Sequence, residues 1–226
     1  MNKLSLRFFN IYHHIFGEHF NKRIDYKFPS NVMRWDLAKE VIKRKNYKRY
    51  LEIGCDTDLL FSKIPDLNIK IGVDPISGGN YRGTSDEFFK QNKNYFDCIF
   101  IDGLHTYKQV KNDILNSIKF LNDDGVILVH DCLPANFYQQ AVPRCKMLWT
   151  GDVWKSIVEL RTKDNIDACV CRIDMGVGII KKRKNSKKLE FNCRDFSKLK
   201  YKEYYANYVN FMRIISYEDI FNFLNA

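Results

Sequence analysis

Short apolar runs alternate with amphipathic segments through the central part of the chain. The strand-like runs are short and rich in apolar residues, and they lie at residues 49–54, 69–73, 96–102 and 126–129. Segments with apolar residues at helical spacing, such as residues 32–44 and 106–121, lie before and between them. Buried strands that alternate with helices are typical of parallel sheets. The pattern therefore predicts an α/β fold with a Rossmann-like, mostly parallel sheet and helices on both faces.

Two further strand-like runs, at residues 168–173 and 175–180, follow each other with almost no connection. Only antiparallel strands can be joined by so tight a turn. Cys169 and Cys171 alternate along the first run, so they share one face of the sheet and are interpreted as packing residues. We therefore expect the parallel sheet to end in an antiparallel hairpin.

The two ends of the chain flank a predicted core domain at residues 32–182. Residues 1–31 are expected to form a helical extension, because apolar residues recur there at helical spacing, at Leu4, Phe8, Ile11, Tyr12 and Ile15. We favour a helix packed on its own domain or on a second subunit over a membrane-surface helix, because the polar face is not strongly basic. Residues 183–226 are expected to form a C-terminal helical extension. Its aromatic stretch at 201–211 and the N-terminal helix are candidates for a homodimer surface.

Composition and charge narrow the classes of protein that the sequence allows. The chain has 226 residues, of which 45% are hydrophobic, and this excludes a wholly disordered chain. With 37 Lys and Arg against 27 Asp and Glu, the net charge is +10, which favours acidic partners. The basic run at 181–188 raises the alternative of nucleic-acid binding. It follows a predicted strand and holds no aromatic residue, so we expect a solvated loop and consider nucleic acid an improbable partner.

Cysteine spacing and hydropathy exclude further classes. The seven cysteines are odd in number and include no C-x-x-C pair, which argues against a zinc ribbon and against a secreted disulfide framework. The sequence has no apolar run of about 18 residues, so no membrane span is expected. These features predict a cytoplasmic protein with reduced cysteines.

Polar residues close each of the four central strands. They are Glu52 and Gly54, then Asp74, then Asp102, and finally His130 and Asp131. Parallel strands bring their carboxyl ends to one edge of the sheet, where ligands bind in open α/β folds. A carboxylate at the end of the second strand can accept hydrogen bonds from both ribose hydroxyls. Any one such residue could simply cap the following helix, but four in succession favour a nucleoside site.

The motifs at these strand ends resemble those of class I S-adenosylmethionine-dependent methyltransferases. They are Leu51-Glu52-Ile53-Gly54-Cys55, Gly72-Val73-Asp74-Pro75, Ile101-Asp102-Gly103-Leu104-His105 and His130-Asp131-Cys132-Leu133-Pro134. The chain is most similar to a small bacterial group with I-D-G-x-H and H-D-C-x-P motifs, related to sugar and natural-product O-methyltransferases. The resemblance covers residues 32 to 180, and it implies a seven-stranded sheet with the last hairpin antiparallel.

The resemblance also implies which residues hold the cofactor, S-adenosylmethionine. Glu52, Gly54 and Cys55 would lie along its methionine part, Asp74 on its ribose, Ser85 and Asp86 beside its adenine, and Asp102 also in contact with it. The family usually has two more glycines in the first loop, where this chain has Asp56 and Asp58. Acidic residues there would repel a pyrophosphate, which argues against a dinucleotide. They are tolerable beside a cationic sulfonium.

Two mechanisms for activating an acceptor hydroxyl stay open at this point. In the slightly favoured one, His105 is the general base, with Asp102 or Asp131 orienting it and His130 as a further catalytic candidate. In the other, Asp102 and Asp131 bind a divalent cation such as Mg²⁺, as the related O-methyltransferases imply. Cys132 falls where some relatives have an oxygen ligand, and sulfur suits Mg²⁺ poorly.

The acceptor itself is less readable from the sequence. The irregular segment near residues 134–151 is expected to form an acceptor lid, because it combines aromatic, Arg and amide side chains. The expected activity is O-methylation of a sugar or glycan-precursor hydroxyl, a small-molecule or glycan acceptor. The alternatives are an RNA or DNA methyltransferase that uses the basic surface, and a non-catalytic module that only binds the cofactor.

Overall fold

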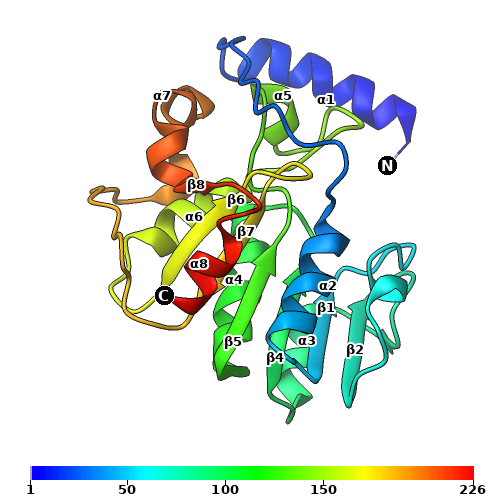
Figure 1. The fold of residues 1–226 in the computed structure, drawn as a ribbon. Helices are drawn as coiled ribbons and strands as arrows, with labels where there is room; N and C mark the ends of the chain where they lie inside the picture. Colours follow the sequence, from blue (N-terminus) through cyan, green and yellow to red (C-terminus); the bar gives the residue numbers. More distant parts are fainter. Residues whose placement is uncertain (1) are drawn as a thin grey trace.

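A single mixed sheet forms the centre of the molecule (Figure 1). The computed structural model describes residues 2–226. The strands are β1 (Arg49–Ile53), β2 (Ile69–Asp74), β3 (Tyr81–Arg82), β4 (Phe96–Ile101), β5 (Leu121–Val129), β6 (Asp167–Cys171), β7 (Val177–Lys181) and β8 (Ile214–Ile215). Their order across the sheet is β3-β2-β1-β4-β5-β7-β6-β8.

The strand directions confirm the predicted topology. β1 pairs in parallel with β2 and β4, and β4 pairs in parallel with β5. β7 is antiparallel to both β5 and β6, so β6 runs in the same direction as β5. The expected antiparallel hairpin is therefore present. The sheet has one strand more than the seven expected, because the two residues of β8 extend it beside β6.

Helices cover both faces of the sheet, as predicted. They are α1 (Lys3–Phe16), α2 (Arg34–Arg44), α3 (Ser85–Gln91), α4 (Tyr107–Lys119), α5 (Phe137–Gln140), α6 (Trp154–Arg161), α7 (Tyr201–Met212) and α8 (Ile220–Asn225), with 3₁₀ turns at Phe61–Lys63 and Phe196–Lys198. α2 and α8 pack on one face, and α3, α4, α6 and α7 pack on the other (Figure 1).

Alternation along the strands gives each face its own hydrophobic core. In β1, Leu51 and Ile53 belong to the core under α3, α4 and α6, while Tyr50 belongs to the core under α2 and α8. Cys169 and Cys171 share the second core, which confirms that they lie on one face. All seven cysteines are free thiols.

Tertiary structure outweighs local sequence signals at several points. Thr84 is the N-cap of α3 and exchanges hydrogen bonds with Glu87 in a capping box, although Ser85 follows it. The cap of α2 is Met33, with no side-chain hydrogen bond, although Ser30 and Asn31 precede it. Residues 122–125 lie within β5, where the register with β4 shifts, although their Asn-Asp-Asp-Gly composition is typical of a turn. Residues 58–64 form turns and one short 3₁₀ turn.

Three residues of the C-terminal aromatic stretch are buried within this chain, while Tyr205 and Tyr208 are half-buried. Tyr201 and Tyr204 are fully buried and Phe211 is almost so, all within the core of this chain. The Tyr204 hydroxyl also lies 2.6 Å from that of Tyr26, so these rings bind the N-terminal segment to α7. They are therefore unavailable for a partner subunit. Every helix within residues 2–226 is too short or too polar to cross a lipid bilayer.

Candidate functional site

Four titratable side chains meet at the carboxyl edge of the sheet, beyond β4 and β5. Asp102 follows β4, His105 lies three residues further, and His130 and Asp131 follow β5. His105 Nδ1 lies 2.9 Å from Asp131 Oδ2, and its Nε2 lies 3.3 Å from Asp102 Oδ1. His130 Nδ1 lies 3.1 Å from the same Asp102 oxygen. The structure therefore brings together these sequence-predicted residues.

His130 is enclosed by protein on all sides. Its side chain is 3% exposed, and its Nε2 lies 2.7 Å from the backbone oxygen of Asp174 in the β6–β7 turn. Burial opposes protonation, but Asp131 and Asp102 outweigh it and raise the pKa of His130 well above its usual value. With both ring nitrogens engaged, His130 ties the end of β5 to the hairpin turn and to Asp102. This geometry suits a positioning residue better than one that contacts substrate.

His105 is more open, and both of its ring nitrogens face carboxylates. Burial again opposes the charge, but Asp102 and Asp131 outweigh it and raise the pKa of His105 to about 10. In return, and against the effect of its burial, His130 and His105 hold the pKa of Asp102 well below its usual range. The cluster is therefore a set of opposite charges near neutral pH. The contribution of charged His105 to the stability of the fold is complete below about pH 6.5. It is lost as the pH rises through about 10.

The predicted acceptor lid packs directly on His105. The Trp149 ring stacks on the His105 ring with centroids 5.3 Å apart and planes 15° apart. The Arg144 guanidinium lies 5.5 Å from the centre of the Trp149 ring on which it stacks. Asp152, just beyond the lid, accepts from the backbone N–H of Tyr107 at the start of α4. The lid is thus attached at the point where the candidate chemistry takes place.

Gly151 allows the backbone of the lid to approach His105 closely, and a substitution at Gly151 tests this contact. Its φ is +59°, and an added Cβ would lie 1.7 Å from the His105 backbone oxygen. Gly151→Ala should therefore lower the free energy of unfolding by about 1–3 kcal/mol or more and displace the lid. Gly103→Ala is the matched control, because its Cβ would meet nothing closer than 3.4 Å. Equal stability of the two variants in chemical denaturation would contradict this account.

Two residues of the cluster, Arg34 and Asp174, were not predicted from the sequence. Arg34, the first residue of α2, places Nη1 2.9 Å from Asp174 Oδ2 and Nε 3.4 Å from Asp102 Oδ2. Asp174 and Met175 both have positive φ, so the β6–β7 turn is strained. A signal for both was present. The helix before a parallel strand begins at the carboxyl edge, and the predicted hairpin places its turn at that same edge.

The donor set can accommodate a metal ion. Asp102, His105 and Asp131 each offer a ligand atom, and these atoms lie within 4.8 Å of one another. Asp131 Oδ1 is buried without a hydrogen-bond partner. Cys132 does not belong to the set, because its Sγ points to the backbone oxygen of Val129, 3.3 Å away. Two carboxylates and an imidazole suit a divalent cation.

The loop after β1 has the conformation of a glycine-rich loop without its glycines. Gly54 has φ +87°, and an added Cβ would lie 2.3 Å from the Asp102 backbone oxygen. Asp56 and Asp58, at the positions where the related family has glycine, also have positive φ. Asp58 Oδ1 accepts from the backbone N–H of Gly79 at 2.6 Å. The Asp58 side chain thus helps to hold the loop in a shape that glycine would otherwise permit.

Asp74 lies at the end of β2 with one carboxylate oxygen only partly used. Oδ1 accepts from the backbone N–H groups of Ile76 and Ser77, while Oδ2 accepts only from that of Asp56, at 3.1 Å. Burial opposes ionisation, but these N–H groups outweigh it and hold the pKa of Asp74 below its usual value. Since a carboxylate oxygen accepts about two hydrogen bonds, Oδ2 can still accept one from a hydroxyl.

Glu52 and Cys55 are both buried, although the resemblance implies that they lie along the cofactor. Burial raises the pKa of Glu52 to about 8, although the Tyr50 hydroxyl donates to it at 2.6 Å. The Cys55 thiol is buried against Gly72 and Gly79, where it fills the space that a Cβ would take. Glu52 is therefore largely uncharged near neutral pH, and a cation at this edge would favour its ionised form.

The start of α3 places Ser85 and Asp86 in different surroundings. Asp86 is exposed in the first turn of the helix. Ser85 is buried and donates through Oγ to Asp113 Oδ1 at 2.6 Å. Burial raises the pKa of Asp113 to about 6. Ser85 therefore links α3 to α4, and Asp86 is the more accessible of the two.

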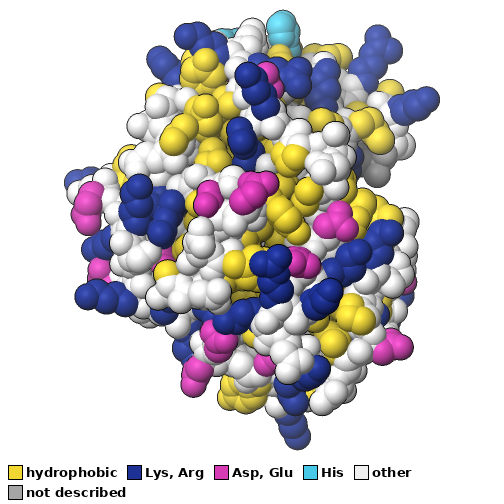
Figure 2. All heavy atoms as spheres, viewed as in Figure 1, with side chains coloured by type: hydrophobic (Ala, Val, Ile, Leu, Met, Phe, Trp, Pro, Cys, Tyr) yellow, Lys and Arg dark blue, Asp and Glu magenta, His cyan; other side chains and the backbone are white. Residues whose placement is uncertain are grey.

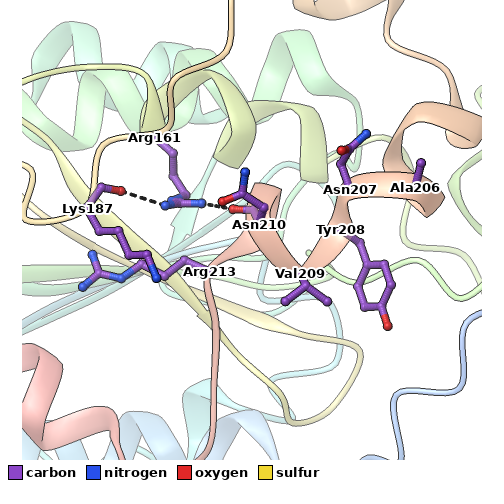
Figure 3. A pocket seen from close by; sticks show the side chains of 8 residues that line it. All are labelled: Arg161, Lys187, Ala206, Asn207, Tyr208, Val209, Asn210 and Arg213. Carbon is purple, nitrogen blue, oxygen red and sulfur yellow. Dashed lines mark hydrogen bonds between the residues drawn. The ribbon is translucent and has the colours of Figure 1, made fainter.

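A cavity of about 330 Å³ lies away from this cluster (Figure 3). Arg161, Lys187 and Arg213 are among the residues that line it. Arg161 donates to the backbone oxygens of Asn210 and Lys187, and Arg213 pairs with Asp167 at the start of β6. These contacts place the cavity at the amino edge of the sheet, opposite the candidate site. The Arg161 and Arg213 side chains that line it bind groups of the protein itself and so attach the C-terminal segment.

Comparisons with known proteins agree with the fold. Residues 70–132 match the family model described as a methyltransferase domain, and this segment holds Asp74, Asp102, His105 and Asp131. No curated protein matches the sequence.

Solved methyltransferases share the fold at low sequence identity. A methyltransferase from Podospora anserina bound to S-adenosylhomocysteine is 15% identical with a TM-score of 0.52, over 81% of this chain and 97% of that one. An O-methyltransferase of tomaymycin synthesis from Streptomyces achromogenes, in complex with S-adenosylmethionine, is 11% identical with a TM-score of 0.50, over 82% and 100%. The chain therefore has a methyltransferase fold, and the matched segment is of methyltransferase type.

Proposed function

We propose that the protein is an S-adenosylmethionine-dependent O-methyltransferase. The observation that carries the proposal is the row of acidic strand ends, from Asp74 after β2 to Asp102 after β4, that leads to the pair of His105 and Asp131. The methyltransferase-domain match over the same residues supports it. When bound, S-adenosylmethionine supplies a methyl group on a cationic sulfonium, which an acidic edge attracts.

The residues at this edge bind and orient the methyl donor. The free lone pair of Asp74 Oδ2 accepts from a ribose hydroxyl, and Asp86 flanks the adenine. Gly54 lets the backbone come close to the methionine part, beside Glu52 and Cys55. Asp102 faces the cationic end of the donor, and its position is fixed by His130 and Arg34.

In its neutral form, His105 then takes the proton of the acceptor hydroxyl. Without ligands the pKa of His105 is about 10, so the ring is charged near neutral pH, and the cationic sulfonium beside Asp102 would favour the neutral form. Asp131, 2.9 Å from Nδ1, orients the ring and stabilises the charge that it gains. Nε2 faces Asp102 across 3.3 Å, and the acceptor oxygen replaces Asp102 as its partner. Bound S-adenosylmethionine would supply the methyl group to this oxygen, and its sulfur would leave as the neutral thioether of S-adenosylhomocysteine. Asp102, His105 and Asp131 are also the residues that would hold a divalent ion such as Mg²⁺, whose charge there would stabilise the acceptor oxygen.

The acceptor that fits the lid best is a sugar or glycan-precursor hydroxyl. Trp149 stacks on His105, and Arg144 lies over the same ring. A sugar ring would stack on Trp149 in place of the Arg144 guanidinium, which then favours an anionic derivative. Mass spectrometry of glycans from cells with and without the gene tests this acceptor class. A methyl-sized mass difference on a glycan supports it, and unchanged glycans beside a methylated nucleic acid would contradict it.

The basic run gives little support to the nucleic-acid alternative. Lys181, Lys182, Arg183 and Lys188 pair with acidic residues of the same chain, Asp124, Asp123, Asp167 and Asp164 respectively. Arg183 also donates to the backbone oxygen of Phe223 in α8. Much of the run therefore pairs with acidic residues of its own chain, and Arg183 attaches it to the C-terminal segment. A cytoplasmic location stays a prediction.

Removal of the Asp74 carboxylate tests the donor site. Asp74→Ala should weaken S-adenosylmethionine binding by about 1.5–3 kcal/mol, a factor of about 10–150 in Kd, because a charge-assisted hydrogen bond is lost. Asp74→Asn keeps one oxygen for the loop N–H groups, so it separates loss of the ligand contact from loss of the loop. The matched control is Asp66→Ala, an exposed acid before β2. Calorimetry that finds equal affinity in all three variants would exclude Asp74 as the ribose ligand.

A further inference from the structure

The N-terminal helix α1 has an apolar stripe that no other segment of residues 2–226 covers. Its members are Leu4, Phe8, Ile11, Tyr12, Ile15 and Phe16, which are 43–77% exposed. They are spaced so that they follow one side of the helix. These side chains do not pack on their own domain, so of the predicted alternatives a second subunit or a membrane surface is left to cover them. Exposed apolar patches of this kind mark interaction surfaces.

The opposite side of α1 is what attaches the helix to the protein. His13 is 6% exposed, its Nε2 lies 2.7 Å from the backbone oxygen of Pro143, and its ring meets the Phe137 ring edge-on. Both partners belong to the segment expected as the acceptor lid. The helix thus lies across the end of the molecule above α5 (Figure 1). Helical spacing and exposure put the apolar stripe on the side away from the anchor.

The charges around the stripe indicate which kind of surface it binds. Residues 3–16 contain no Asp or Glu, and Lys3 and Arg7 are exposed beside the stripe. Lys22, Arg23 and Lys146 are exposed on neighbouring segments, and Lys and Arg side chains gather at this end of the molecule (Figure 2). A second copy of the chain would bring these cations together in a molecule of net charge +10, which like-charge repulsion disfavours. An anionic surface meets the apolar and the basic residues at once.

We propose that α1 binds the surface of anionic lipid membranes, with its apolar stripe in the interface and its basic residues at the headgroups. Amphipathic helices of this composition lie in the plane of the interface. Met147 and Leu148 of the lid are 73% and 53% exposed and add apolar surface to the segment that anchors α1. One helix gives reversible, salt-dependent binding. This inference does not depend on the proposed methyl transfer.

Vesicle co-sedimentation with the full chain tests the proposal. We expect binding to vesicles that contain phosphatidylglycerol, much weaker binding to phosphatidylcholine alone, and release at about 1 M salt, where the Debye length falls to about 3 Å. Phe8→Ser with Ile11→Ser should weaken binding about tenfold or more. Lys3→Gln with Arg7→Gln should weaken it about 30-fold, since each basic residue near an anionic surface contributes a factor of about five.

Two control variants test whether vesicle binding depends on α1 itself or on exposed apolar and basic residues elsewhere in the chain. Tyr95→Ser with Val209→Ser removes two side chains that are 52% and 62% exposed on other segments, and Lys184→Gln with Lys187→Gln removes two charges from the basic run. Both should bind as the wild type does. The proposal is overturned if neutral and anionic vesicles bind equally, or if the Phe8 and Ile11 changes leave vesicle binding intact. It is also overturned if sedimentation finds a dimer that these changes dissociate and no vesicle binding.

Discussion

Asp102→Asn should reduce the rate of methyl transfer by about 10²–10³-fold, the usual loss when a preorganised charge is removed from a reacting centre. The Asp102 carboxylate lies 3.1–3.4 Å from His130, His105 and Arg34 at once. Asparagine keeps the shape but leaves these three cationic groups facing one another. The free energy of unfolding should fall by about 3–5 kcal/mol, as for other broken buried ion pairs.

The matched control is Asp174→Asn, which separates lost chemistry from lost stability. Asp174 contacts Arg34 and His130 but not His105, and its side chain is 7% exposed. We expect a comparable loss of stability with a much smaller loss of rate, measured well below both melting temperatures. If the two variants lose the same fraction of activity, Asp102 has only a structural role.

His105→Ala should reduce methyl transfer by about 10²–10⁴-fold, while a chelator should leave the wild type active. The first expectation follows because a positioned general base contributes this much to a proton transfer. Asp131 lies 2.9 Å from Nδ1 and keeps the ring oriented without any ion. The assay compares initial rates with and without chelator, and His14→Ala is the control, because His14 is exposed on α1.

The opposite result would assign the chemistry to a metal ion. Activity that is abolished by chelator, restored by Mg²⁺ or Mn²⁺ and only mildly affected by His105→Ala would contradict the base mechanism. The donor set makes this a genuine test, because Asp102, His105 and Asp131 satisfy both the base and the ion-binding geometry.

The sheet was predictable because its strands carry their own signals. Apolar runs that alternate with helices defined the parallel part, and the near-absence of a connection between residues 173 and 175 defined the hairpin. The two-residue strand β8 carries no periodicity, so nothing in the sequence marked it. Residues 122–125 look like a turn by composition. Leu121 nevertheless pairs with Phe96, and the register shift absorbs the irregular residues.

The candidate site was predictable where strand ends define it, and less so where loops and helices contribute. Asp102, His105 and Asp131 converge because β4 and β5 are parallel neighbours. Arg34 and Asp174 were missed because each is an ordinary charged residue next to a helix start or a turn. Aromatic residues at helical spacing fit a core and an interface equally well, so the sequence could not show that Tyr201, Tyr204 and Phe211 belong to the core. Only the burial of Tyr201 and Tyr204 distinguishes the two.

The central claim is that the methyl donor and the acceptor meet at the carboxyl edge of the sheet. A crystal structure of the protein with S-adenosylhomocysteine tests this most directly. The account predicts the ribose on Asp74 and the sulfur facing the cluster of Asp102, His105 and Asp131. Ligand bound elsewhere, for example in the cavity beside Arg161 and Arg213, with the carboxyl edge unchanged, would contradict it.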